Sequence, residues 1–125
     1  MTNQPIFQAY SSDYLYQPPS PTDEPLTVMR DWNVYRLTDS DGKVTDHLVG
    51  LSYLDGRVTT GIISSDHAKL RYTTESGRVY QLEGDPRHSS PGHYVFSRWL
   101  RVNGIAHQDN VTQSYVDAQN AAKVG

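Results

Sequence analysis

The sequence contains no cysteine, which excludes disulfides, thiol nucleophiles and cysteine-ligated metal or iron–sulfur sites. It also lacks an apolar run near the roughly 18 residues of a membrane span, and its first residues form neither the basic nor the apolar region of a secretion signal. Hydrophobic residues make up only 36% of the 125 residues, which allows one domain with a thin core. We therefore expect a small soluble protein with a cytoplasmic location.

Basic residues are absent from the first 25 positions, so Asp13, Asp23 and Glu24 carry the whole net charge of −3. Five of the seven prolines also lie in this segment, and proline favours an extended backbone without amide donors. We predict a proline-rich acidic N-terminal arm over residues 1–25, followed by a single α+β domain over residues 26–125. Aromatic residues in the arm leave open whether it is a mobile tail or docks on the domain or on a partner.

A short turn phrase recurs three times in the domain. Asp41-Gly42, Asp55-Gly56 and Ser76-Gly77 are each followed by a basic residue and a valine. Asp-Gly and Ser-Gly supply the positive φ of a two-residue hairpin turn, and β-branched valine favours the return strand. Their uneven spacing does not fit a solenoid. The sequence thus predicts a curved antiparallel β-meander of about five strands, over residues 27–38, 43–54, 57–64, 69–75 and 78–83.

Two-residue loops at these turns also predict the register of the sheet. They place Gly50 opposite Gly61, which leaves a dent that a helix of the protein or a ligand fills, and they pair Glu75 with Arg78. Side chains alternate between the faces, and both faces carry apolar groups, so we expect both to be covered. One face is predicted to hold Trp32, Val34, Val49, Leu51, Tyr53, Val58 and Ile62, and the other Tyr35, Leu37, Leu48 and Ile63.

The helical signals lie in the last third of the chain. An amphipathic helix is predicted over residues 91–103, with Ser90 as N-cap, Pro91 in the first turn and Gly104 after the end. A second helix is predicted over residues 111–123, and its signal is weaker because its apolar side contains small residues. The apolar stripe of the first helix, expected to cover the sheet, consists of Val95, Phe96, Trp99, Leu100 and Val102.

The sequence has no catalytic signature or cofactor motif, and we expect neither a cofactor nor a metal. Its five histidines have none of the HxH, HxxxH or HExxH spacings that bring two metal ligands together. His47 is predicted on the Trp32 face of the sheet. Arg87, His88 and His93 share a loop and a helix start, and function concentrates in loops. They carry an alternative hypothesis, a small metal-assisted or His-dependent hydrolase.

A second alternative is a single-stranded nucleic-acid-binding sheet. Several of the predicted strands carry tyrosine, tryptophan and arginine, which stack on bases. Phosphate binding needs clustered lysine and arginine, however, and the predicted domain has eleven basic against eleven acidic residues and no basic run. The charge balance therefore disfavours this class.

Recognition of another protein is the function that we favour. Arginine outnumbers lysine eight to three, and arginine and tyrosine are enriched at protein interfaces. We predict a non-catalytic interaction module, an adaptor or inhibitor of bacterial or phage type that blocks or locks a larger protein. Pairing of strand 27–38 or 78–83 with a second copy would give a homodimer. The candidate interaction residues are Tyr10, Tyr14 and Tyr16 in the arm and Tyr94, Arg98 and Arg101 on the first helix.

Overall fold

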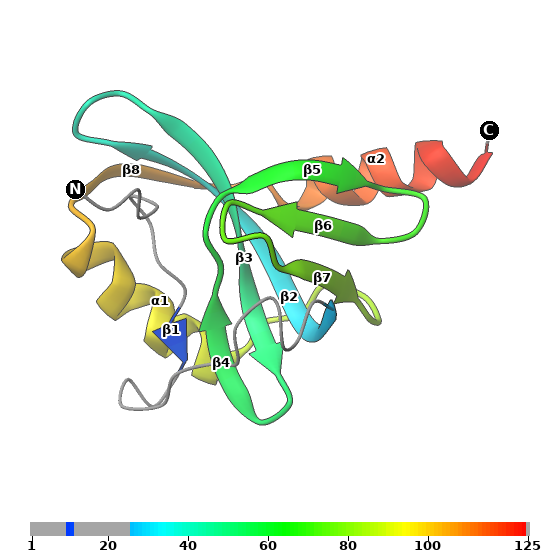
Figure 1. Cartoon of the computed structure of the whole chain (residues 1–125), viewed down its shortest axis with the longest axis horizontal. Coiled ribbons are helices and arrows are strands. Elements are labelled where there is room, and N and C mark those ends of the chain that lie inside the picture. The colour runs from blue at the N-terminus through cyan, green and yellow to red at the C-terminus, as the bar shows by residue number, and fades with distance from the viewer. Residues whose placement is uncertain (1–9, 12–25, 125) are drawn as a thin grey trace.

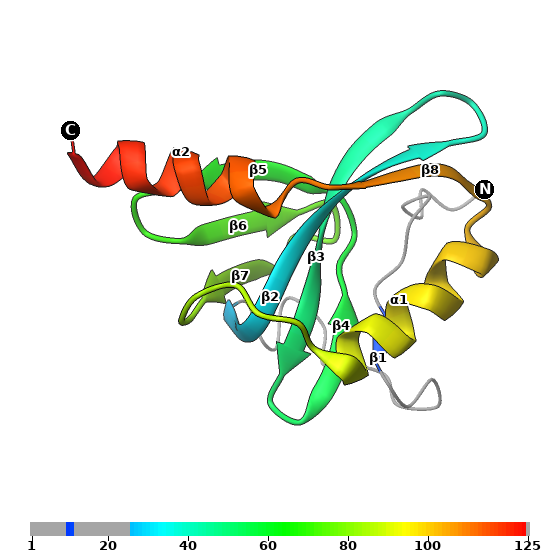
Figure 2. The same ribbon diagram turned by 180° about the vertical axis from the view of Figure 1, so that it is seen from behind.

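The fold is described for residues 10–11 and 26–124 in a computed structural model. This part of the chain has the predicted α+β class, with one helix on the sheet and a second at the C-terminal end. The two helices lie at opposite ends of the molecule in both views (Figures 1 and 2). In chain order the elements are β1 (Tyr10–Ser11), β2 (Leu26–Asp39), β3 (Val44–Ser52), β4 (Asp55–Val58), β5 (Ile62–Asp66), β6 (Arg71–Thr74), β7 (Val79–Leu82), α1 (Ser90–Val102), β8 (Ile105–Asn110) and α2 (Thr112–Val124).

Strand β2 is the long central strand of the sheet (Figure 1). One of its edges pairs antiparallel with β3, and the other pairs first with β7 in parallel and then with β8 antiparallel. The full order is β1-β4-β3-β2-β7-β6-β5, so the sheet is mixed and not a plain meander. Among the described residues neither β2 nor β7 is an edge strand, so the free edge on which the predicted pairing with a second copy relied is absent from both.

The predicted strand 57–64 divides into β4 and β5 because residues 59–61 leave the ladder. The hydroxyl of Thr59 accepts a hydrogen bond from the Leu48 N–H and donates one to the Thr60 carbonyl. Side-chain bonds of this kind compete with the ladder and end it. The chain then turns away, and β5 pairs with β6 instead of continuing beside β3.

Two of the predicted turns are present but have three-residue loops. Gly42 and Gly77 adopt positive φ, +85° and +90°, as the third loop residue. Three-residue loops of this type end in a left-handed glycine. Thr38 therefore pairs with Val44, and the register of β2 and β3 differs by one residue from the prediction.

The extra loop residue also separates Glu75 from Arg78, so their predicted ion pair is wrong. Glu75 instead accepts a hydrogen bond from the Gly61 N–H and lies 3.6 Å from the Lys43 ammonium. Arg78 donates to the hydroxyl of Thr27 on β2. These contacts connect β7 and its loop to elements far away in the sequence.

The third predicted turn, Asp55-Gly56, is wrong, because the chain reverses two residues earlier, at Tyr53 and Leu54. Ser52 pairs with Asp55 across this reversal, and Gly56 lies within β4. A Cβ at Gly56 would collide with the backbone of Pro91 and Gly92 at the start of α1. The glycine thus serves the close approach of a helix.

The same shift removes the predicted Gly50/Gly61 pair. Gly50 lies opposite Arg57. A side chain at Gly50 would meet Met29 and the Arg30 carbonyl, so no dent remains for a ligand. The space is filled by the protein itself.

Apolar side chains gather in two clusters on the two faces of the sheet. Val49 lies under α1, whereas Trp32 and Ile62 lie in the other cluster with Leu48, so the predicted row of Trp32, Val49 and Ile62 is wrong. A register shift of one residue moves a side chain to the opposite face. Coverage of both faces is as predicted. The first cluster contains Leu37, Val49, Val58, Val95, Phe96 and Trp99, and the second Met29, Trp32, Val34, Leu48, Tyr72, Tyr80 and Leu82.

Helix α1 begins one residue earlier than predicted. The Ser89 hydroxyl, not that of Ser90, accepts from the Gly92 N–H and caps the helix. Val95, Phe96 and Trp99 are buried as expected, but Val102, also predicted in the apolar stripe, is 68% exposed.

Strand β8 and helix α2 complete the described chain. Strand β8 was not predicted, because it is a polar strand whose residues beyond Ile105 are exposed. Helix α2 follows the prediction closely, and Tyr115 and Val116 pack it against the second cluster. Gln119 is buried and donates to the hydroxyl of Tyr72. Over residues 10–11 and 26–124, neither helix has the length and apolar character needed to cross a membrane.

Candidate functional site

The predicted helix candidates lie on the outer side of α1. Arg98 donates a hydrogen bond of 3.1 Å to the Tyr94 hydroxyl, and its guanidinium carbon lies 5.8 Å from the tyrosine ring centre. Tyr94 and Arg98 therefore form one exposed pair, at the i,i+4 spacing that brings side chains together on a helix. Arg101 is exposed in the last turn.

The arm candidates are only partly described. Tyr10 belongs to β1, and its backbone pairs with Val58 of β4. Tyr14 and Tyr16 lie outside the described residues.

Of the three loop candidates, His88 and His93 lie close together. The ring centres of His88 and His93 lie 5.2 Å apart, and both side chains are exposed. Arg87 is held by its backbone, which donates to the Trp32 carbonyl and accepts from the Asn33 side chain. Within residues 10–11 and 26–124, no group of three His, Asp or Glu side chains is arranged to hold a metal ion. Two neighbouring imidazoles do not provide the three or four ligands of a zinc site.

His47 was also considered, and it lies on the α1 face and not on the predicted Trp32 face. It is fully buried, with its ring centre 5.1 Å from that of Trp99. The Thr59 carbonyl only accepts, so Nδ1 carries the proton and donates over 2.8 Å, while Nε2 accepts from the Thr45 hydroxyl at 2.7 Å. Burial lowers the pKa of His47, which keeps the ring neutral and structural.

A polar network joins α2 to the sheet on the other face. Arg36 donates to both carboxylate oxygens of Asp46, at 2.8 and 3.0 Å, and the Tyr115 hydroxyl donates to the same carboxylate at 2.6 Å. Burial raises the pKa of Asp46, but the hydrogen bonds from Arg36 and Tyr115 outweigh burial and leave that pKa below its ordinary value. Burial, together with the neighbouring carboxylate, raises the pKa of Tyr115. The network stabilises the docked helix.

Replacing Tyr115 with phenylalanine is expected to lower the free energy of unfolding by about 1.5–3 kcal/mol at neutral pH, because the lost hydrogen bond goes to a charged group. The depressed pKa of Asp46 makes its contribution complete above the unfolded carboxyl pKa and lost as pH falls through the folded value. Y115F raises that folded pKa, so the acid loss of stability becomes smaller. Urea unfolding at neutral and acidic pH measures both effects. Y94F, which loses an exposed hydroxyl, serves as the control and should change stability by less than about 0.5 kcal/mol.

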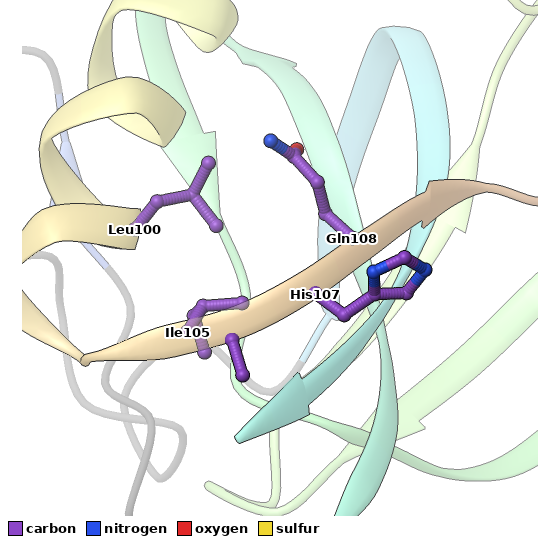
Figure 3. A pocket seen from close by; sticks show the side chains of 5 residues that line it. Leu100, Ile105, His107 and Gln108 are labelled. Atoms are coloured by element: carbon purple, nitrogen blue, oxygen red, sulfur yellow. The ribbon is translucent and has the colours of Figure 1, made fainter. Parts of the chain in front are cut away.

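The hollow between α1 and β8 has no arrangement of side chains that points to a particular chemistry. It has a volume of about 270 Å³ and is lined by Leu100, Ile105, Ala106, His107 and Gln108. Figure 3 shows Leu100 extending from α1 toward β8, beside the side chain of Gln108. His107 is exposed and lies 3.4 Å from Asp109 of its own strand. Because no buried polar group points into the hollow from its lining, we assign it no catalytic role.

The tip of the β3–β4 hairpin is a site that the sequence reasoning missed. Leu54 is 88% exposed and Tyr53 is 64% exposed, at the end of a hairpin that projects from the sheet (Figure 1). Tyr53 also has a φ of +57°, a left-handed conformation that is rare for a bulky residue. The sequence signal for this site is two large apolar residues directly before Asp55-Gly56, but the glycine favours a turn two residues later.

No family model matches this chain, and no curated protein or solved structure matches it either. The hairpin tip and the Tyr94/Arg98 pair are two exposed features with large apolar or aromatic surface, and Ile63 on β5 and Val102 on α1 are also exposed.

Proposed function

We propose that the protein is a non-catalytic recognition module that inserts the hairpin tip, Tyr53 and Leu54, into an apolar pocket of a protein partner. The supporting observation is that the two most solvent-facing residues of the hairpin are large and apolar, where turns usually carry glycine, asparagine or aspartate. Such residues add nothing to the core from this position. Their use is explained by contact with another molecule.

Backbone strain at the tip supports the same function. A left-handed conformation costs a residue with a side chain roughly 1–2 kcal/mol, and strain of this kind concentrates at functional sites. Tyr53 keeps this conformation although the residue is 64% exposed, so burial inside the fold does not account for the cost. The constrained turn presents both side chains in one geometry, which reduces the entropy lost on binding.

The shape and chemistry of the tip define the partner surface. A narrow, convex hairpin end fits a concave site, and tyrosine is enriched among the residues that dominate binding energy. Burying the Leu54 side chain would contribute about 1.5–3 kcal/mol, equivalent to a roughly 10- to 150-fold change in affinity. Occupying a pocket of a larger protein would act as an inhibitor or adaptor does, by blocking that pocket or favouring one conformer.

The experiment places a photo-crosslinking residue at position 54 of the full chain in the native host. The matched control carries it at position 102, which is also an exposed apolar position but lies at the end of α1. We expect a partner that crosslinks from position 54 only, and whose affinity falls at least tenfold with Leu54→Ser but stays unchanged with Val102→Ser. An affinity that L54S leaves intact contradicts the proposal.

Tyr53→Gly separates binding from folding. Glycine adopts positive φ without a steric cost, so stability should be unchanged or higher by up to about 1 kcal/mol, while partner binding weakens. A variant that loses stability and affinity in parallel would mean that Tyr53 serves the fold.

A further inference from the structure

Strand β8 has one edge that is open in the described structure. Its other edge pairs with β2, in a register that is regular from His107 to Asn110. In the described part of the chain no strand pairs with the opposite edge of β8. The residues of β8 beyond Ile105 are exposed. An exposed edge presents backbone donors and acceptors with which another strand can pair.

The ladder with β2 shows which backbone groups of β8 point to the open edge. Directly after β8, the Val111 N–H donates to a carbonyl of β2 over 2.9 Å. Hydrogen-bonded pairs alternate along an antiparallel ladder, so the backbone groups of Asp109 and His107 also point toward β2. The N–H and C=O groups of Gln108 and Asn110 therefore point away from β2, to the open edge.

The side chains at this edge are arranged symmetrically about Gln108. His107 and Asp109 are two residues apart and share one face of the strand, where the imidazole Nε2 lies 3.4 Å from the carboxylate. Gln108 lies opposite Leu37, which packs under α1, so its side chain is on the other face. Figure 3 shows it there beside Leu100. A possible cation and an anion thus flank the central residue of the edge.

This arrangement makes the edge complementary to itself. In a two-fold antiparallel pair, Gln108 meets Gln108 of a second copy, and the two backbones exchange both hydrogen bonds. His107 then lies opposite Asp109 of the second copy, twice, in the non-hydrogen-bonded positions where side chains are closest. Moving the two-fold axis by one residue would place Asp109 opposite Asp109, or His107 opposite His107. The charges therefore favour the register centred on Gln108.

We propose that β8 is the interface of a two-fold homodimer, in which two copies of β8 pair antiparallel about Gln108 and the sheet continues from one copy into the other. The β3–β4 hairpin tip lies apart from β8 in both views (Figures 1 and 2), so this dimer does not depend on the proposed function of the tip. The occupant of the open edge is a second copy of the same chain.

The first test is sedimentation equilibrium of the full chain from micromolar to near-millimolar concentration, which should show a monomer–dimer equilibrium. Gln108→Pro should give a folded monomer, because it removes an outward N–H and no ladder bond to β2. Ser65→Pro is the matched control on β5, the edge strand at the far end of the sheet. Ser65 lies opposite Tyr72, whose backbone groups face β7, so its N–H also points outward. This control should dimerise as the wild type does.

Charge variants test the register and decide the matter if Q108P does not fold. His107→Glu or Asp109→Lys alone should raise the dimer dissociation constant roughly tenfold, because each changes two symmetry-related pairs. The double variant should regain the wild-type constant, since opposite charges again face each other across the two copies. The proposal is overturned by a wild type that stays monomeric throughout the concentration range. A folded Q108P protein that dimerises like the wild type, or a double variant as weak as the single ones, overturns it as well.

Discussion

Replacing Trp99 with alanine is expected to lower the free energy of unfolding by about 3–5 kcal/mol, the usual cost of deleting a buried tryptophan. Trp99 is 1% exposed, stacks on Phe96 and contacts the buried ring of His47. It therefore lies where α1 joins the sheet, and its loss removes contacts to both. Chemical denaturation followed by far-UV circular dichroism measures the change.

Tyr94→Ala is the matched control, because it removes an aromatic side chain from the exposed side of the same helix. It should cost less than about 1 kcal/mol, since surface substitutions have small effects. Equal losses of stability in W99A and Y94A would show that the inner face of α1 does not hold the helix on the sheet, contrary to the packing described above.

Replacing Gly56 with alanine is expected to have the second largest effect, at least about 2–3 kcal/mol. The added Cβ would collide with the backbone of Pro91 and Gly92, and a backbone segment moves aside less easily than a flexible side chain. The first turn of α1 should lift from β4. Amide hydrogen exchange should show this as faster exchange across α1, together with a lower unfolding midpoint.

Gly42→Ala provides the comparison, since Gly42 has open space around its Cβ position and a φ of +85°. Gly42→Ala should lower the free energy of unfolding by about 1–2 kcal/mol, the cost of placing a side chain in a left-handed backbone conformation, without faster amide exchange in α1. A G56A protein that keeps the exchange rates of α1 would contradict the role of Gly56 in the helix approach.

Local sequence signals predicted where the helices and strands lie better than they predicted the register between paired strands. Helix α1 and the strands β2, β3, β6 and β7 were found because periodicity, caps and turn glycines act over a few residues. The register failed because a glycine at a turn does not reveal whether the loop has two or three residues. At Gly56 the signal misled for a different reason, since the constraint comes from α1, which is more than thirty residues away in the sequence.

The candidate residues also divide into those placed by local sequence signals and those placed by distant parts of the fold. Tyr94 and Arg98 were predicted on the exposed side of the first helix, and their i,i+4 spacing on that helix explains the contact that the structure shows between them. The exposure of Leu54 and the burial of Arg57 depend on where the hairpin reverses and on what covers β4. A one- or two-residue error in the turn was therefore enough to hide both from sequence reasoning.

The parallel pairing of β2 with β7 also has a consequence for biosynthesis. Leu26 pairs with Val79, and the second half of β2 pairs with β8 near residue 105. During translation β2 leaves the ribosome before β7 and β8, so it gains these neighbours only after they have been made. A nascent chain that ends before β8 leaves this edge of β2 unpaired, and an unpaired strand edge favours aggregation. Synthesis of β8 therefore removes an edge through which the nascent chain could aggregate.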